Sequence, residues 1–182
     1  MYKTTEIASS EIPSDNPVHQ RLLFPYQHVS QIVGGNVLEI GCGTGRGVAV
    51  LVDKVSAYTG VDKNTELMQS LSVTYPDFKF IDMFLPPLQD LPDNHFDFVI
   101  TFQVIEHIEN DKQELDQAYN LLNENSSILI IVPAYNHLYN DFDKAMGHYR
   151  KYTKKSINLI IPDNGKVEKI IYLDSLGFYT SL

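Results

Sequence analysis

The segment from Asn36 to Gly45, NVLEIGCGTG, has the residue types of a turn that contacts a ligand. An apolar, strand-like run containing Glu39 leads into glycine at every second position, beginning with Gly41 and Gly43. Glycine accepts positive φ angles and has no Cβ to hold a ligand away from the backbone. Main-chain N–H groups of such a turn, at the start of a helix, suit a polar or anionic ligand group. We therefore expect this loop to bind a ligand, and the alternative is a glycine-rich loop that only makes a tight turn.

The spacing of the glycines separates two classes of nucleotide-binding loop. The dinucleotide fingerprint G-x-G-x-x-G needs a third glycine where this chain has Arg46. The pattern present is G-x-G-x-G, with Gly47 beyond it and Leu38-Glu39-Ile40 before it. This segment resembles motif I of the class I S-adenosylmethionine-dependent methyltransferases. Arg46 argues against a nicotinamide-dependent oxidoreductase, which remains a second hypothesis.

Carboxylates end the next two predicted strands. Asp62 closes strand 57–62, 21 residues after the first glycine of the loop, and an acidic residue is expected about 20 residues on. Asp82 closes strand 78–82, where it can accept a hydrogen bond from an exocyclic amine. Met83 follows with an apolar, polarizable surface for a ring. The alternative is that both aspartates serve as ordinary helix-capping or turn residues.

A fourth segment runs from Phe96 to Ile108, FDFVITFQVIEHI, and resembles another motif of the same family, which often reads FD.V......EH. The resemblance covers about residues 35–135 and implies an S-adenosylmethionine pocket. The implied contacts are Gly41, Cys42, Gly43 and Gly45 with the methionine part, Glu39 with its amino group directly or through water, Asp62 and Lys63 with the ribose, Asp82 and Met83 with the adenine, and Gln103 from below the methyl group.

Methyl transfer from a sulfonium is an in-line displacement, so much of the acceleration can come from holding donor and acceptor in line. A base is needed only where the acceptor must lose a proton. His107 is a candidate base, and the alternative is that Glu106-His107 only opens a helix. The sequence therefore names no obligatory catalytic residue.

The region after the fifth strand is a second candidate for the acceptor side. A subset of class I methyltransferases has a similar D...GH.R.Y pattern, which here is Asp143, Gly147, His148, Arg150 and Tyr152. Five of the 14 basic residues lie close together, namely Lys144, Arg150, Lys151, Lys154 and Lys155. Arginine is well shaped for carboxylate or phosphate, so we expect a small, anionic acceptor and add His148 and Arg150 to the catalytic candidates. The alternative is a solvated basic turn that caps the next helix.

The elements that must position these residues alternate along the chain. The patterns predict helices at 18–33, 46–54, 64–73 and 111–124, and strands at 36–41, 57–62, 78–82, 96–103 and 127–133. Such alternation indicates an α/β fold with a parallel sheet, and the Ile-rich strand 127–133 is typical of a central strand. The resemblance implies a Rossmann-like three-layer sandwich, with helices on both faces of a mostly parallel sheet in the order 3-2-1-4-5-7-6. Strand six is expected at 167–173 and no seventh is found, so the C-terminal antiparallel hairpin is incomplete or begins only at Phe178–Leu182.

The composition fits one domain over residues 1–182, of which 43% are hydrophobic. We divide it into an N-terminal arm and helix (1–35), a cofactor-binding core (36–133), and an acceptor-side segment with a C-terminal strand (134–182). The net charge of −9 argues against nucleic acid as a partner.

The single cysteine, Cys42, fits a reducing cytosol, because it cannot form an intrachain disulfide. The longest apolar run has seven residues, whereas a membrane span needs about 20, so we expect a cytoplasmic protein without a membrane partner. We expect no metal, and a homodimer is an option that would cover the unpaired sheet edge. A non-catalytic methyltransferase-like domain that binds the cofactor or a partner is the remaining alternative.

Overall fold

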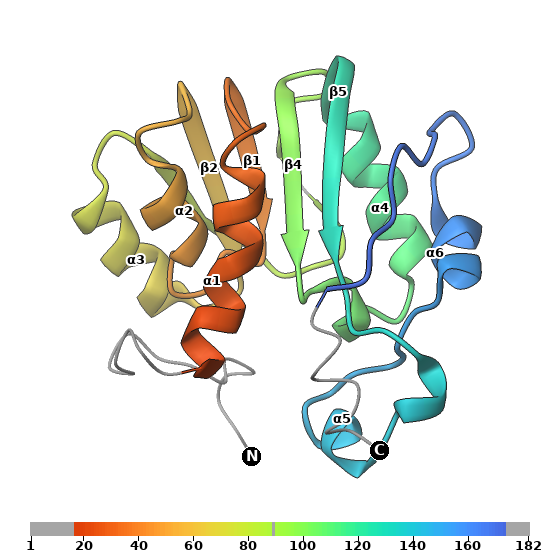
Figure 1. The fold of residues 1–182 in the computed structure, drawn as a ribbon. Coiled ribbons are helices and arrows are strands. Elements are labelled where there is room, and N and C mark those ends of the chain that lie inside the picture. Colours follow the sequence, from red (N-terminus) through yellow and green to blue (C-terminus); the bar gives the residue numbers. More distant parts are fainter. Residues whose placement is uncertain (1–16, 89, 174–182) are drawn as a thin grey trace.

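A parallel sheet is the framework of the computed structural model, which describes residues 17–88 and 90–173 (Figure 1). Its strands are β1 (Asn36–Ile40), β2 (Ala57–Asp62), β3 (Lys79–Asp82), β4 (Phe96–Phe102) and β5 (Leu122–Ile131). They lie in the order β3-β2-β1-β4-β5, and each neighbouring pair is parallel. All the carboxyl ends therefore meet at one edge, where open α/β sheets bind ligands. The predicted order of these five strands is confirmed.

Helices cover both faces of the sheet. They are α1 (Pro17–Val29), α2 (Arg46–Leu51), α3 (Thr65–Thr74), α4 (Asp111–Asn120), α5 (Asp141–Ala145) and α6 (Lys154–Ile160), with short 3₁₀ helices η1 (Ile105–His107) and η2 (Asn136–Leu138). Side chains alternate along β1, so Val37 packs with α1, α2 and α3 on one face, and Leu38 packs with α4 on the other. The result is the predicted three-layer α/β sandwich (Figure 1).

The prediction of a C-terminal strand at 167–173 is wrong. This stretch forms neither helix nor strand, and its apolar side chains Val167, Ile171, Tyr172 and Leu173 are exposed. Its alternating pattern finds no partner, because within residues 17–88 and 90–173 no strand pairs with the outer edge of β5. The segment Phe178–Leu182 lies outside the described residues.

Strand β5 also differs from its prediction. It begins at Leu122, because α4 ends at Asn120 instead of 124, and it lies at the edge of the described sheet instead of the centre. Its apolar residues 128–131 are only half-buried as a result. None of the described helices has the length and apolar character needed to cross a bilayer.

Candidate active site

The glycine loop is hydrogen-bonded to β2 and packs against the end of β4. The N–H groups of Gly41 and Cys42 donate to the carbonyl oxygen of Val61 at the end of β2, at 2.8 and 3.1 Å. Gly41 has φ +72°, and a Cβ there would lie 2.4 Å from a methyl carbon of Val104, just beyond β4. Only glycine meets both conditions, so the loop can lie directly against the end of β4.

Glu39 is buried beneath the loop. The hydroxyl of Tyr26 on α1 donates to Oε1 at 2.6 Å, and the hydroxyl of Tyr58 on β2 donates to Oε2. A Cβ at Gly47 would lie 1.9 Å from Oε2, so the carboxylate also sits against the first turn of α2. Burial, together with the charge of Glu39, raises the pKa of both tyrosines well above the usual value. The predicted contact with a ligand amino group stays a prediction, and the two tyrosine partners gave no signal in the sequence.

Asp62 lies against the loop at the end of β2, and its contact with a ribose stays a prediction. Its Oδ2 accepts from the backbone N–H of Gly43 at 3.1 Å, and its Oδ1 accepts from that of Asn64 at 3.0 Å. The side chain is half-buried and lines the same cavity as Gly41, Cys42 and Gly43. Lys63 lines this cavity too, from an exposed position.

Asp82 and Met83 lie apart from the main cavity. They border a smaller hollow of about 530 Å³ beside β3, and Asp82 accepts a hydrogen bond from the Thr65 hydroxyl. Phe84 is 77% exposed and borders both hollows. Its aromatic ring, which sequence reasoning missed, is therefore a further candidate for stacking against a flat ligand group.

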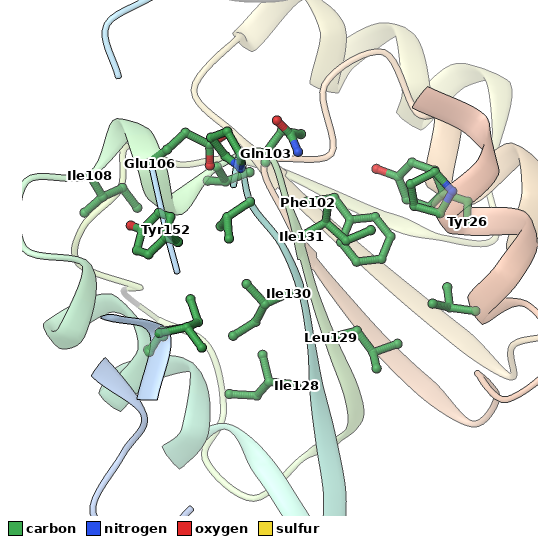
Figure 2. Close-up of a pocket in the computed structure, with 18 of the residues that line it drawn as sticks. Tyr26, Phe102, Gln103, Glu106, Ile108, Ile128, Leu129, Ile130, Ile131 and Tyr152 are labelled. Atoms are coloured by element: carbon green, nitrogen blue, oxygen red, sulfur yellow. The ribbon is translucent and has the colours of Figure 1, made fainter. Parts of the chain in front are cut away.

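The main cavity opens at the carboxyl edge of the sheet and has a volume of about 2570 Å³. It exceeds the usual 300–1,000 Å³ of a ligand pocket because it continues along both faces of β5. Figure 2 shows Ile128 and Ile130 on one side of this strand and Leu129 on the other. Gln103, at the end of β4, borders the cavity with φ +58°, and a non-glycine residue in this region is typical of functional sites.

Segment 147–152 clamps the turn that contains η1. The Tyr149 N–H donates to the Glu106 carbonyl oxygen at 2.7 Å. Arg150 forms a 2.7 Å ion pair with Asp111 and donates to the carbonyl oxygens of Ile108 and Glu109. Tyr152 also donates to Asp111, at 2.8 Å. The two motifs that sequence analysis treated separately therefore form one packed unit.

Arg150 does not line the cavity, and its guanidinium holds the η1 turn in place. Burial opposes its charge, but the carboxylate of Asp111 outweighs this and raises the pKa of Arg150. The structure thus places Arg150 outside the cavity lining, and its catalytic role stays a prediction.

The clamp brings Glu106, His107 and His148 together at the cavity wall. The two imidazole rings lie 4.6 Å apart, edge to face. Nδ1 of His148 lies 3.1 Å from a carboxylate oxygen of Asp143, and the other oxygen of Asp143 pairs with Lys151 at 2.9 Å. Asp143 and Lys151 thus orient the His148 ring, an arrangement that the sequence pattern around Asp143 did not predict.

Burial has opposite effects on the two η1 side chains. It lowers the pKa of His107 to about 4, with further lowering by His148 and Lys63, although backbone hydrogen bonds at Gly147 and Met146 oppose it. It raises the pKa of the fully buried Glu106 carboxyl to about 8. His107 is therefore an uncharged imidazole at neutral pH, and its lowered pKa makes it a weak base.

A family model described as a methyltransferase domain matches residues 17–165, which include every candidate residue above. The chain belongs to the class I S-adenosylmethionine-dependent methyltransferases. Over 109 residues, this methyltransferase chain is 30% identical to a probable S-adenosylmethionine-dependent methyltransferase of Mycolicibacterium smegmatis, over 59% of this chain and 42% of the relative. It is 25% identical to a probable one of Mycobacterium tuberculosis, over 71% of this chain and 47% of the relative. The chain spans about half the length of these curated relatives.

Solved structures share the methyltransferase fold at low identity. The N-methyltransferase NodS from Bradyrhizobium japonicum, in complex with S-adenosyl-L-homocysteine, has a TM-score of 0.63 and 17% identity, over 81% of this chain and 74% of NodS. The YcgJ protein of Bacillus subtilis has a TM-score of 0.64 and 18% identity, over 78% of this chain and 66% of YcgJ. Both support the Rossmann-like assignment.

Proposed function

We propose that this methyltransferase domain moves the methyl group of S-adenosylmethionine to a small-molecule acceptor by in-line displacement. The observation that carries the proposal is the 3.1 Å hydrogen bond from the Gly43 N–H to Asp62, which joins the glycine loop to the residue proposed to bind the ribose. Gln103 borders the same cavity from the end of β4. The methyltransferase names of the relatives support the same activity.

The residues present fit the cofactor. Gly41 and Gly43 leave the loop backbone open to a ligand, and Asp62 offers carboxylate oxygens that can accept from both ribose hydroxyls. Glu39 is buried beneath the loop, outside the cavity lining, and would supply negative charge to the amino and sulfonium groups of a bound cofactor. Phe84 borders both hollows and, with Asp82 and Met83 in the smaller one, would supply the adenine side.

The acceptor side is formed by the clamped turn. An acceptor that must lose a proton passes it to solvent or to His107, which is uncharged but a weak base, while the methyl carbon bonds to the acceptor and the sulfur leaves with its electron pair. We keep the proposal of an anionic acceptor, supported by Lys63 at the cavity wall, since Lys151 lines the cavity but is paired with Asp143. Arg150 contributes by holding the turn, since its guanidinium is engaged with Asp111.

The first experiment is calorimetric titration of the chain with S-adenosylmethionine, S-adenosylhomocysteine and NAD. We expect the first two to bind and NAD not to bind. The variant Asp62→Ala should weaken binding at least about tenfold, since hydrogen bonds to charged groups contribute about 1.5–3 kcal/mol each. The matched control Asp53→Ala removes an exposed carboxylate outside the cavity lining and should bind like the parent.

The other outcomes separate the competing functions. Binding of NAD alone would refute the methyltransferase proposal in favour of an oxidoreductase. Binding of S-adenosylmethionine without transfer to any acceptor in a panel of small alcohols, phenols, amines and carboxylates would favour the non-catalytic cofactor-binding domain. Sedimentation of the same sample tests the proposed homodimer.

A further inference from the structure

Glu106, His107 and His148 converge outside the glycine loop. One ligand atom from each side chain lies within 4.8 Å of the other two. The first two residues come from η1 and the third from the segment that clamps it, where the Tyr149 N–H bonds the Glu106 carbonyl. The clamp thus fixes the approach of these three side chains from distant parts of the chain.

Glu106 provides an independent sign of a missing partner. Its side chain is 0% exposed, and neither carboxylate oxygen has a hydrogen-bond partner within the described parts of the chain, 17–88 and 90–173. A buried carboxyl group keeps its charge only where it is paired with a cation or coordinates a metal, and otherwise it neutralises by holding a proton. A bound cation would take the place of that proton and supply the partner that the two oxygens lack.

The two histidines are oriented as metal ligands usually are. A metal-binding imidazole normally donates its second ring N–H to a carboxylate or a backbone carbonyl, which fixes the ring and leaves the other nitrogen for the metal. Nδ1 of His148 faces the Asp143 carboxylate at 3.1 Å, and Lys151 holds that carboxylate from its other side. The His107 ring lies beside the backbone of Gly147 and Met146, and a Cβ built at Gly147 would lie 3.9 Å from its Nδ1.

We propose that Glu106, His107 and His148 form a binding site for one divalent transition-metal ion at the acceptor side of the cavity. Two imidazoles and one carboxylate suit zinc, iron(II) or manganese, whereas magnesium and calcium prefer oxygen ligands alone. Ligand atoms about 2.1 Å from an ion lie roughly 3–3.5 Å apart, so binding draws these side chains inward by about an ångström. Three protein ligands leave further positions open, as in catalytic metal sites.

The role of the ion rests on the proposed function, although its binding does not. An ion in this position would bind an oxygen atom of the acceptor and lower the pKa of that hydroxyl group, so that its proton passes to solvent at neutral pH. The ion would also hold the oxygen atom in line with the methyl group. The oxygen lone pair then forms the new bond to carbon, and the carbon–sulfur pair leaves with the sulfur. An anionic oxygen acceptor thus gains a counter-charge that Arg150, engaged with Asp111, does not supply.

The test is titration of the chain, freed of metal with EDTA and dialysed, with Zn²⁺, Co²⁺ or Mg²⁺. We expect one equivalent of Zn²⁺ or Co²⁺ to bind, with a change in the visible spectrum of Co²⁺, and Mg²⁺ to bind far more weakly. Glu106→Gln and His148→Gln should each weaken Zn²⁺ binding at least about tenfold, and Asp143→Asn by roughly 10- to 100-fold. The matched control His95→Gln, which removes an exposed imidazole just before β4, should leave binding unchanged.

Two controls keep the test decisive. Circular dichroism and S-adenosylhomocysteine titration of each variant in EDTA show that the fold and the cofactor pocket are intact. Substoichiometric Zn²⁺ binding, or equal affinities in folded Glu106→Gln, His148→Gln and parent chains, would overturn the metal site. A chain that binds Zn²⁺ at these residues but binds no S-adenosylhomocysteine would overturn the proposed function alone.

Discussion

The contact between the glycine loop and the end of β4 yields a quantitative prediction for Gly41→Ala. The new Cβ would meet a methyl carbon of Val104 at 2.4 Å, and the residue would keep φ +72°. The left-handed backbone costs about 1–2 kcal/mol for a residue with a Cβ, and overpacking costs typically 1–3 kcal/mol. We therefore expect Gly41→Ala to lower the free energy of unfolding by about 2–5 kcal/mol.

A second substitution separates these two costs. Val104→Ala removes the methyl groups that the new Cβ would meet, so in that background Gly41→Ala should cost only the backbone part of about 1–2 kcal/mol. The coupling free energy between the two positions is then about 1–3 kcal/mol, which is the overpacking part. Val104→Ala alone should also cost a little, because its side chain is half-buried.

Urea unfolding of the parent chain, both single variants and the double variant measures this coupling. Titration with S-adenosylhomocysteine should follow the same order, because the loop that is displaced is the proposed cofactor loop. A coupling below about 0.5 kcal/mol would refute the reasoning, since residues in direct contact should not be additive. It would mean that the loop does not rest on the end of β4.

Three further variants test polar side chains that are buried or partly buried. Burial raises the pKa of Glu114 on α4 from 4.5 to about 7, so between these pH values the folded chain keeps a proton that the unfolded chain loses. In urea unfolding, Glu114→Gln should therefore raise the free energy of unfolding by about 3 kcal/mol near pH 8 and leave it unchanged below about pH 4.5. A gain independent of pH would contradict this. Arg150→Lys should cost about 1–3 kcal/mol in urea unfolding, because lysine cannot keep both carbonyl bonds and the pair with Asp111, and unchanged stability would remove the clamp. Tyr26→Phe should cost a similar amount and lower the melting temperature, because Glu39 loses a buried donor, and an unchanged melt would show that this bond contributes nothing.

The strands themselves were predictable because their signals are local, whereas their order came from the family resemblance. Strand β2, for example, ends at Asp62, and α3 follows within a few residues. The C-terminal part carried no such signal. The alternating pattern at 167–173 is compatible with a strand, but a strand forms only where it pairs with a neighbouring one. Segment 167–173 pairs with no described strand, and the outer edge of β5 stays unpaired. Apolar residues on both faces of β5 likewise cannot distinguish an edge strand from a central one.

The candidate site was predictable where residues act through the backbone or through fixed spacing. The loop and Asp62 meet because β1 and β2 are neighbours, a relation that the strand order itself implies. The partners of Glu39 were missed because Tyr26 and Tyr58 come from different elements, 13 and 19 residues away, and no spacing rule links them. A basic side chain at Arg150 gave no indication that it would be neutralised within the chain.

The two acceptor-side motifs explain each other once they are considered together. Glu106 and His107 lie on a turn that must be rigid to keep a carboxyl group buried. Arg150 and Tyr152 fix this turn, because both bind Asp111 and Arg150 also binds the Ile108 carbonyl oxygen. The same segment then presents His148 to the pair. A basic segment used in this way cannot also supply its arginine to an anionic acceptor. The positive charge that such an acceptor requires must therefore come from a cavity lysine such as Lys63 or from an ion held by the three clustered side chains, and the zinc titration distinguishes these sources.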